Sequence, residues 1–430
     1  MTPAARVSAA IEVLADIEGR RRPASDAMKD WGLTHRFAGS GDRAAISALV
    51  YDALRRKSSS AWLMGESTPR AEAIGALKQT RGLDLGAIAA LFTGEGHAPA
   101  ALSDGERDRL ATATLEGAPA HVAGDFPEWL APQFEAAFGA EAAEEGRALA
   151  DRAPVDLRAN LIKTTREKAL AALAHLSAEP TPLSPVGLRI AIRPDGRGPA
   201  LNAEPAYVKG LIEIQDEGSQ LAALLSEAKP GLQVLDLCAG AGGKTLALAA
   251  MMDNHGQVYA TDEDRRRLTP IFDRLTRSGA RNVQVRAPKG QADVVADLEG
   301  RCDLVMIDAP CTGSGAWRRN PDAKWRIRPG ALEQRMKDQD EALENAVRFA
   351  QIGGRIVYVT CSVLRAENED RASAFLGRHD DFLPVDAATA ARAAGLPALA
   401  ERASPFGPGL RLSPHTTGTD GFYVATLVKL

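Results

Sequence analysis

The chain has few cysteines, few aromatic residues and no long apolar run. Its four cysteines in 430 residues are too few for a disulfide framework, and none stands at the spacing of a zinc site. No run of about 18 apolar residues occurs, so we expect no membrane span. The first residues lack the apolar stretch of a secretory signal. We therefore expect reduced thiols and a cytoplasmic protein.

The net charge of −4 argues against a general binder of polyanions, although RNA needs only a local basic face. Basic clusters occur at 20–22, 55–57, 265–267 and 318–328. Any single cluster is most often a solvated helix face. The last cluster also holds Trp317 and Trp325, so its Arg318, Arg319 and Lys324 are candidate RNA contacts.

The length predicts two or three domains. Residues 1–135 show helical spacing of apolar residues and no convincing strand. Residues 145–225 mix short strand and helix patterns, with strands at 155–160 and 187–192, and indicate a small α+β domain. Residues 226–430 alternate strands with helices, which predicts a doubly wound α/β sheet. A helix is also expected from 132 to 149.

Five apolar runs in the C-terminal range are expected to be strands of this sheet, and a sixth ends the chain. They lie at 233–237, 258–261, 283–286, 304–307, 355–360 and 421–429. In an open α/β sheet, ligands bind outside the carboxyl ends of the strands. Residues that directly follow these runs are therefore the candidates for a functional site.

A glycine-rich turn follows the first of these runs and opens a helix. It consists of Cys238, Ala239, Gly240, Ala241, Gly242, Gly243 and Lys244. It is neither a P-loop nor a full Gly-x-Gly-x-x-Gly pattern, but its glycines permit close approach of a ligand to the backbone. Asp262 follows the second run, where a carboxylate can hold ribose hydroxyls. The pattern favours a nucleotide-type cofactor over a merely tight turn.

Two cysteines end strands. Cys311 closes the motif Asp308-Ala309-Pro310-Cys311, and Cys361 directly follows Thr360. Free cysteines usually pack a core. A thiolate can instead add to carbon 6 of a cytosine, which makes carbon 5 nucleophilic toward a sulfonium methyl group. Cys361, Cys311 and Asp308 could supply the nucleophile, the proton transfer and an acid at the ring.

These motifs resemble the RNA cytosine-5 methyltransferases, and among them the bacterial RsmB/Nop2/Sun enzymes that modify small-subunit ribosomal RNA. The resemblance rests on 308–315, 318–325, 360–364 with Glu367 and Asn368, 235–238, 215–220 and 421–423. The N-terminal stretches 41–43 and 49–56 are similar to the NusB-like helical RNA-binding domain of that subfamily. The resemblance therefore implies a class I methyltransferase sheet behind a NusB-like domain and a small α+β connection.

The resemblance also implies the cofactor, the partner and the roles of the site residues. S-adenosylmethionine would be the methyl donor, cradled by the turn from Cys238 to Lys244 with Asp262 on its ribose. Cys361 would be the nucleophile, Cys311 would assist proton removal and enzyme release, and Asp308 would contact the cofactor or the cytosine. The partner would be small-subunit ribosomal RNA, and we expect a monomer.

Two positions depart from the family pattern. Ala241 stands where the family usually has proline, which should cost little because alanine is also small. Pro288 stands where the family commonly has the aspartate that contacts adenine. Asp293 or backbone groups could replace that contact.

Three other functions are compatible with part of the sequence. A DNA cytosine-5 methyltransferase would take its nucleophile from Pro310-Cys311, which leaves Cys361 unexplained, and no Glu-Asn-Val motif occurs. A non-catalytic RNA-binding or ribosome-assembly factor is compatible with Pro288. A nicotinamide dehydrogenase would leave both thiols idle. Binding and transfer of labelled S-adenosylmethionine distinguish these alternatives.

Overall fold

The computed structural model describes residues 1–192, 198–290 and 292–430 of the chain. They form two compact units. Unit 1 contains Met1–Arg152 and Trp317–Arg328, and unit 2 contains Ala153–Ala316 and Pro329–Leu430. The segment 317–328, which sequence analysis placed in the C-terminal range, thus packs within unit 1. The division between the ranges 145–225 and 226–430 stays a prediction.

The regular elements in the described residues of unit 1 are all helices, as predicted. Its elements are α1 Pro3–Arg20, α2 Ala24–Thr34, α3 Ser40–Arg55, α4 Lys57–Met64, α5 Pro69–Arg81, α6 Leu85–Ala89, α7 Asp104–Thr112, α8 Ala120–Ala123, η1 Glu128–Leu130, α9 Ala131–Phe138, η2 Gly139–Glu141, α10 Ala142–Ala150 and α17 Ala323–Arg326. α1 begins where the Thr2 hydroxyl accepts a hydrogen bond from the Ala5 N–H. The helix expected from 132 to 149 is divided at Gly139, whose φ of 55° is not helical.

The segment 317–328 is anchored in unit 1 by its two tryptophans. The Trp325 indole N–H donates to the carbonyl oxygen of Leu54 at 2.7 Å. The Trp317 ring stacks on Phe134 with 5.9 Å between ring centroids. These contacts explain why a segment far along the sequence belongs to the helical unit.

Unit 2 begins with an antiparallel four-stranded sheet of order β2-β3-β1-β4. Its elements are β1 Val155–Ala159, α11 Arg166–Ala172, η3 Ala174–Leu176, β2 Glu179–Pro180, β3 Gly187–Ile190, η4 Leu201–Ala203, α12 Pro205–Val208, β4 Ile212–Ile214 and α13 Glu217–Leu224. The predicted strands at 155–160 and 187–192 are confirmed as β1 and β3.

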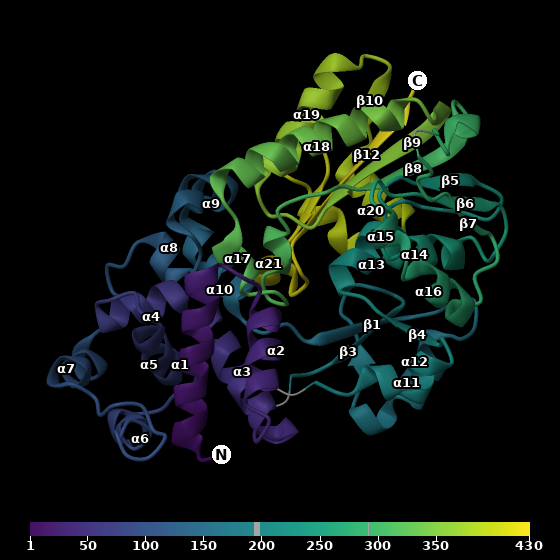
Figure 1. Ribbon diagram of the computed structural model, residues 1–430. Coiled ribbons are helices and arrows are strands. Elements are labelled where there is room, and N and C mark those ends of the chain that lie inside the picture. Colours follow the sequence, from purple (N-terminus) through teal and green to yellow (C-terminus); the bar gives the residue numbers. More distant parts are fainter. Residues whose placement is uncertain (193–197, 291) are drawn as a thin grey trace. The chain divides into compact units, whose positions relative to one another are not determined.

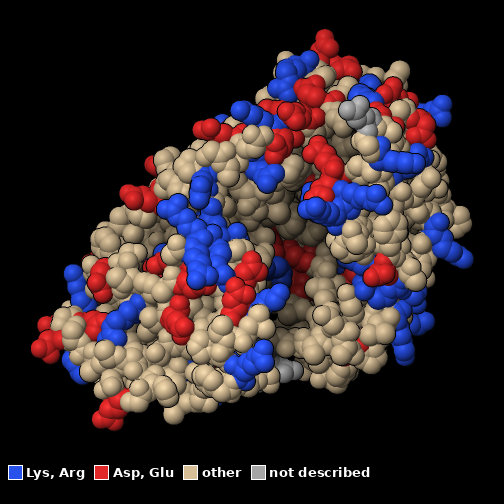
Figure 2. Space-filling view, in the orientation of Figure 1, with Lys and Arg blue, Asp and Glu red and all other residues tan. Residues whose placement is uncertain are grey.

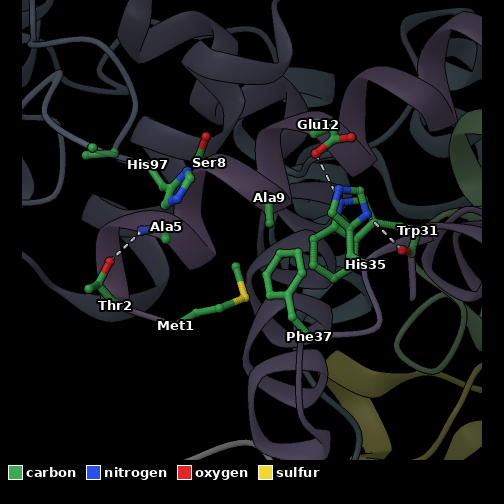
Figure 3. Close-up of a pocket in the computed structure, with 12 residues that line it drawn as sticks. Met1, Thr2, Ala5, Ser8, Ala9, Glu12, Trp31, His35, Phe37 and His97 are labelled. Carbon is green, nitrogen blue, oxygen red and sulfur yellow. Dashed lines mark hydrogen bonds between the residues drawn. The ribbon is translucent and has the colours of Figure 1, made fainter. Parts of the chain in front are cut away.

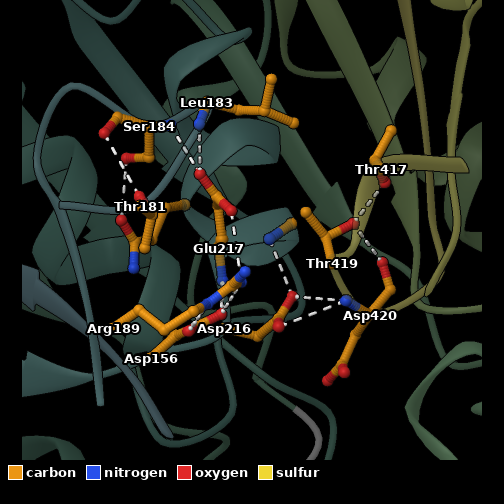
Figure 4. Close-up of polar contacts among 12 residues, drawn as sticks. Asp156, Thr181, Leu183, Ser184, Arg189, Asp216, Glu217, Thr417, Thr419 and Asp420 are labelled. Carbon is orange, nitrogen blue, oxygen red and sulfur yellow. Dashed lines mark hydrogen bonds and ion pairs between the residues drawn. The ribbon is translucent and has the colours of Figure 1, made fainter. Parts of the chain in front are cut away.

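Acidic residues fasten this sheet to the rest of unit 2 (Figure 4). Glu217 accepts a hydrogen bond from the Ser184 N–H at 2.7 Å and pairs with Arg189 on β3 at 3.3 Å. The neighbouring Asp216 accepts a hydrogen bond from the Asp420 N–H at 3.2 Å, just before the last strand of the main sheet. The stretch 215–220, which precedes the main sheet in the chain, therefore contacts both sheets.

The main sheet of unit 2 has the order β10-β12-β9-β8-β5-β6-β7, with β11 paired to β12. Its strands are β5 Gln233–Asp236, β6 Gln257–Ala260, β7 Val283–Val285, β8 Cys302–Asp308, β9 Ala350–Thr360, β10 Phe382–Pro384, β11 Leu410–Leu412 and β12 Phe422–Lys429. The pairs from β9 to β7 are parallel, whereas β12 runs antiparallel to both β9 and β10. The strand order reverses between β5 and β8, where such sheets bind their ligands. The predicted α/β fold class is confirmed.

Helices cover both faces of the main sheet (Figure 1). They are α14 Gly243–Met251, α15 Arg265–Leu268, α16 Ile271–Ser278, η5 Ala296–Leu298, η6 Ser314–Ala316, α18 Pro329–Val347, η7 Arg365–Glu367, α19 Glu369–Arg378, α20 Ala387–Ala393, η8 Pro397–Arg402 and α21 Pro414–Thr417. The core around Val234 packs α13, α14 and α20, and the core around Leu235 packs α18 and α19. Burial on both faces explains the continuous apolar runs. Within the described residues, no helix has the length and apolar character needed to cross a membrane.

Candidate functional site

The glycine-rich turn lies at the carboxyl end of β5, as predicted. Gly240 and Gly242 have φ values of +50° and +80°. A Cβ at Gly242 would lie 2.4 Å from Ile271 Cγ1, so the position accepts only glycine. The Ala239 N–H donates to the Thr261 carbonyl oxygen at 2.8 Å, which holds the turn beside β6. The turn thereby presents the N-terminal N–H groups of α14 at this edge of the sheet.

Asp262 follows β6 after one intervening residue and is buried against the turn. Its carboxylate accepts hydrogen bonds from the Gly240 N–H at 3.0 Å and from the Asp264 N–H at 3.1 Å. Arg267 pairs with it at 3.2 Å. The structure therefore places Asp262 in contact with the turn, as the sequence prediction of a shared cofactor site requires.

Lys244 connects the turn to the end of β8. Its Nζ lies 2.7 Å from Asp308 Oδ2 and 5.2 Å from the centroid of the Phe422 ring. The Lys244 side chain is 6% exposed, whereas that of Asp308 is 34% exposed. A carboxylate with an ammonium group beside it is thus open to a ligand at the carboxyl end of β8.

Burial raises the pKa of two ionisable groups at the turn. Asp236 ends β5 and accepts a hydrogen bond from the Thr245 hydroxyl at 2.6 Å. Burial raises the pKa of Asp236 to about 7, and the Thr245 hydrogen bond opposes this rise. Burial also raises the pKa of the Cys238 thiol well above its usual value. The negative charge of Asp236 is the second largest cause and raises that pKa further. Cys238 is therefore a protonated thiol and not a nucleophile.

The two predicted catalytic cysteines meet at the ends of adjacent parallel strands. β8 and β9 pair with Asp308 opposite Val359. Cys311 Sγ and Cys361 Sγ lie 3.4 Å apart, which is a contact between free thiols and not a disulfide. The hydrogen bond with Cys361, followed by burial, raises the pKa of Cys311 well above its usual value. Cys311 is thus a thiol at neutral pH that can donate its S–H to the sulfur of Cys361.

Glu367 ties together the two loops that carry these cysteines. Its carboxylate accepts hydrogen bonds from the Thr312 N–H at 2.8 Å and from the Ser362 hydroxyl at 2.5 Å. The side-chain amide of Gln339 on α18 donates to it at 3.0 Å. The motif of the family resemblance includes Glu367, but sequence alone did not reveal that this buried carboxylate positions both loops.

The three candidate RNA contacts lie in unit 1, and two of them are buried. Arg318 is 6% exposed and Lys324 is 1% exposed, while Arg319 is half-buried. The Lys324 ammonium group donates to the carbonyl oxygens of Arg55 and Asp125 at 3.0 and 2.6 Å. This corrects the prediction that Lys324 contacts RNA. Its ammonium group is buried in unit 1 and donates hydrogen bonds to backbone carbonyl oxygens there.

The position after β7 differs from the family pattern, as the sequence indicated. Pro288 stands there and is half-buried. The carboxylate of Asp293, the suggested substitute, pairs with Arg348 at 2.7 Å and accepts a hydrogen bond from the Val295 N–H at 3.1 Å. The Asp293 carboxylate is therefore already engaged by two groups of the protein, Arg348 and the Val295 N–H.

A cavity of about 660 Å³ lies within unit 1 between α1 and the region around α2 (Figure 3). Trp31 stacks on His35 with 4.2 Å between ring centroids and donates its indole N–H to Glu12 at 3.0 Å. Phe37 also lines the cavity. The cavity holds none of the predicted site residues. In the described part of the chain, no group of His, Cys, Asp and Glu side chains could hold a metal ion.

Comparisons with known proteins agree with this geometry. Residues 223–428 match the family model of the 16S rRNA methyltransferase RsmB/F, and residues 126–195 match the RsmF/B-like ferredoxin-like domain. The probable ribosomal RNA small subunit methyltransferase B of Synechocystis is 31% identical over 313 residues, which cover 71% of this chain and 67% of that protein.

Solved structures share the fold. The crystal structure of PH0851 has a TM-score of 0.72 at 24% identity and covers 100% of this chain and 99% of that one. A methyltransferase homolog protein from Pyrococcus horikoshii has a TM-score of 0.59 at 25% identity, covering 72% of this chain and 98% of that one. The relative and the family models above confirm the predicted family, and the chain belongs to the RsmB/F family of 16S rRNA methyltransferases.

Proposed function

We propose that the chain transfers a methyl group from S-adenosylmethionine to carbon 5 of a cytosine in small-subunit ribosomal RNA. The observation that carries the proposal is the 3.4 Å distance between Cys311 Sγ and Cys361 Sγ at the ends of neighbouring parallel strands. Family membership supports methyl transfer to RNA. The thiol pair supports carbon 5 of a pyrimidine, because that carbon becomes nucleophilic only after a nucleophile has added to carbon 6.

The residues around the glycine-rich turn fit S-adenosylmethionine, which supplies an electrophilic methyl group on a sulfonium. The turn from Cys238 to Lys244 would hold the methionine portion, and Asp262 would hold the ribose hydroxyls. Gly240 and Gly242 keep positive φ angles and so bring backbone N–H groups to this edge of the sheet. Asp262 lies in hydrogen-bond contact with Gly240, which supports a single site for both portions.

Cys361 is the nucleophile in this proposal. Its thiolate forms a bond to carbon 6, and the displaced electron pair makes carbon 5 reactive. Once carbon 5 carries the methyl group, Cys361 departs with the S–H proton of Cys311, the resulting Cys311 thiolate takes the proton of carbon 5, and the double bond re-forms. Cys311 thereby assists both release and proton removal, because its S–H lies within reach of the departing sulfur at 3.4 Å and its sulfur becomes a base once that proton has been given up.

The Lys244–Asp308 pair would select cytosine. The carboxylate of Asp308 can accept a hydrogen bond from the 4-amino group, and the ammonium of Lys244 can donate to ring nitrogen 3. That cation would also stabilise the negative charge that reaches the ring when the thiolate adds. Uracil presents the opposite pattern of donor and acceptor at these two positions.

Transfer of labelled methyl groups to small-subunit ribosomal RNA, read by bisulfite mapping, tests the proposal. The wild-type chain should convert a cytosine to 5-methylcytosine, and Cys361→Ala should reduce transfer to background because the variant lacks the proposed nucleophile for carbon 6. Cys302→Ala is the matched control, since Cys302 is buried at the start of β8 and should leave transfer intact.

Two results of that assay would contradict the proposal. Full transfer by Cys361→Ala would remove this cysteine from the chemistry. A wild-type chain that binds the RNA but transfers no methyl group would favour the ribosome-assembly factor instead.

A further inference from the structure

We infer that a basic cavity in unit 1 binds one nucleotide of the RNA substrate. The cavity measures about 380 Å³ and lies where the C-terminal end of α1 meets the segment that contains α17. Figure 2 shows Lys and Arg side chains gathered over this part of unit 1. The inference rests on the proposed function, because it takes RNA as the substrate, and it assigns a contact site outside the thiol centre.

Cations outnumber acids around this cavity. Arg21, Lys57, Arg326 and Arg328 line it together with the acids Glu18 and Asp322. Glu18 pairs with Lys57, and Asp322 pairs with Arg326 at 3.2 Å. No ion pair engages the side chains of Arg21 and Arg328 in the described part of the chain. The cavity therefore has two arginines available for a phosphate.

The backbone of Arg21 is held in an unusual conformation. Arg21 caps the C-terminus of α1 with φ 49° and ψ 44°, and its N–H donates to the carbonyl oxygens of Ile17 and Glu18. This left-handed conformation usually takes glycine, because a side chain there costs about 1 kcal/mol or more. Arg21 takes this conformation in place of the usual glycine, so a cationic side chain lies at the cavity despite that cost.

Part of the cavity lining is apolar and could contact a base. It is formed by Ile17, Leu54 and Trp325. The Trp325 ring is fixed in place because its indole N–H donates to the Leu54 carbonyl oxygen at 2.7 Å. An aromatic ring held among cations is the combination by which proteins bind single-stranded RNA, with the base stacked and the phosphate paired. A free anion would use the arginines but would not need the ring.

The test measures the affinity of the full chain for small-subunit ribosomal RNA over a range of salt concentrations. Arg21→Gln and Arg328→Gln should each weaken binding about fivefold near 0.15 M salt and reduce the slope of log K against log salt by about 1. Arg20→Gln is the matched control: Arg20 adjoins Arg21, is 71% exposed and pairs with Asp16 outside the cavity. It should change affinity by less than about twofold.

Unchanged affinity and salt slope in both variants would overturn the inference. Inorganic phosphate provides a second arm: if phosphate stabilises the wild-type chain and not the variants while RNA affinity stays the same, the cavity binds a free anion and the inference also fails. The proposed function fails separately, because methyl transfer by the wild-type chain is scored in its own assay. If the wild-type chain binds RNA but transfers no methyl group, the RNA affinities of the variants still test the role of this cavity.

Discussion

Lys324 occupies a position that its charge would not suggest. The side chain is buried in unit 1, where it donates hydrogen bonds to the carbonyl oxygens of Arg55 and Asp125. Burial lowers the pKa of Lys324 to about 7, although the charge of Asp125 opposes that shift. Lys324 therefore connects the segment 317–328 to the helices of unit 1. Its protonated form destabilises the folded chain, because the charge is removed from water.

This burial predicts a pH dependence of stability. Because the pKa of Lys324 falls from 10.5 in the unfolded chain to about 7 in the folded chain, the unfolded chain binds more protons between these pH values. Raising the pH from 7 to about 9 should therefore increase the free energy of unfolding in urea. Lys324→Met should lose this increase, whereas the exposed control Lys337→Met should keep it. An equal pH dependence in wild type and Lys324→Met would contradict the assignment.

The placement of single residues could be predicted from sequence where strand ends determine it. Cys311, Cys361 and Asp308 follow parallel strands whose carboxyl ends share one edge of the sheet, so their proximity was predictable. Lys324 was not predictable in the same way. Its partners Arg55 and Asp125 lie far away in the sequence, and a run of charges looks the same whether its members are solvated or buried.

The glycine-rich turn is an element whose shape depends on one tight position. Gly242 combines a φ of +80° with a hypothetical Cβ 2.4 Å from Ile271 Cγ1. Gly242→Ala should destabilise the chain by about 3 kcal/mol in urea unfolding, since backbone strain and overpacking add. It should also weaken binding of S-adenosylmethionine by displacing the turn.

Gly243→Ala is the control for that substitution. A Cβ at Gly243 meets nothing closer than 3.8 Å, and its φ is not in the left-handed region. Its stability should therefore stay close to that of the wild type. Equal unfolding free energies for Gly242→Ala and Gly243→Ala would show that the turn is not constrained as described.

The sequence predicted long elements better than short ones. The strands β5, β8, β9 and β12 were predicted because each buries an apolar run, and the partly exposed β6 and the three-residue β7 were predicted from their place in the alternation of strands and helices. The strands β2, β4, β10 and β11 have two or three residues each, too few for any periodicity to emerge. The break at Gly139 was also missed, because glycine is tolerated inside many helices.

In the molecule as a whole, unit 2 brings the glycine-rich turn and two thiols to one edge of a single sheet. Lys244 pairs with Asp308 and thus links the turn to the strand that carries Cys311. The fold class and these contacts followed from the pattern of strands, whereas the reaction on cytosine followed from the family resemblance. Pro288 departs from the family pattern after β7, and the proposed donor site therefore lacks the aspartate that the family commonly has there.

Isolation of a covalent protein–RNA adduct from the Cys311→Ala variant tests the roles of the two thiols. With Cys311 removed, Cys361 can still add to carbon 6 but elimination is impaired, so the adduct should accumulate and mass spectrometry should find cytosine on the peptide that contains Cys361. An adduct formed by Cys361→Ala, or cytosine attached to Cys311, would contradict the mechanism.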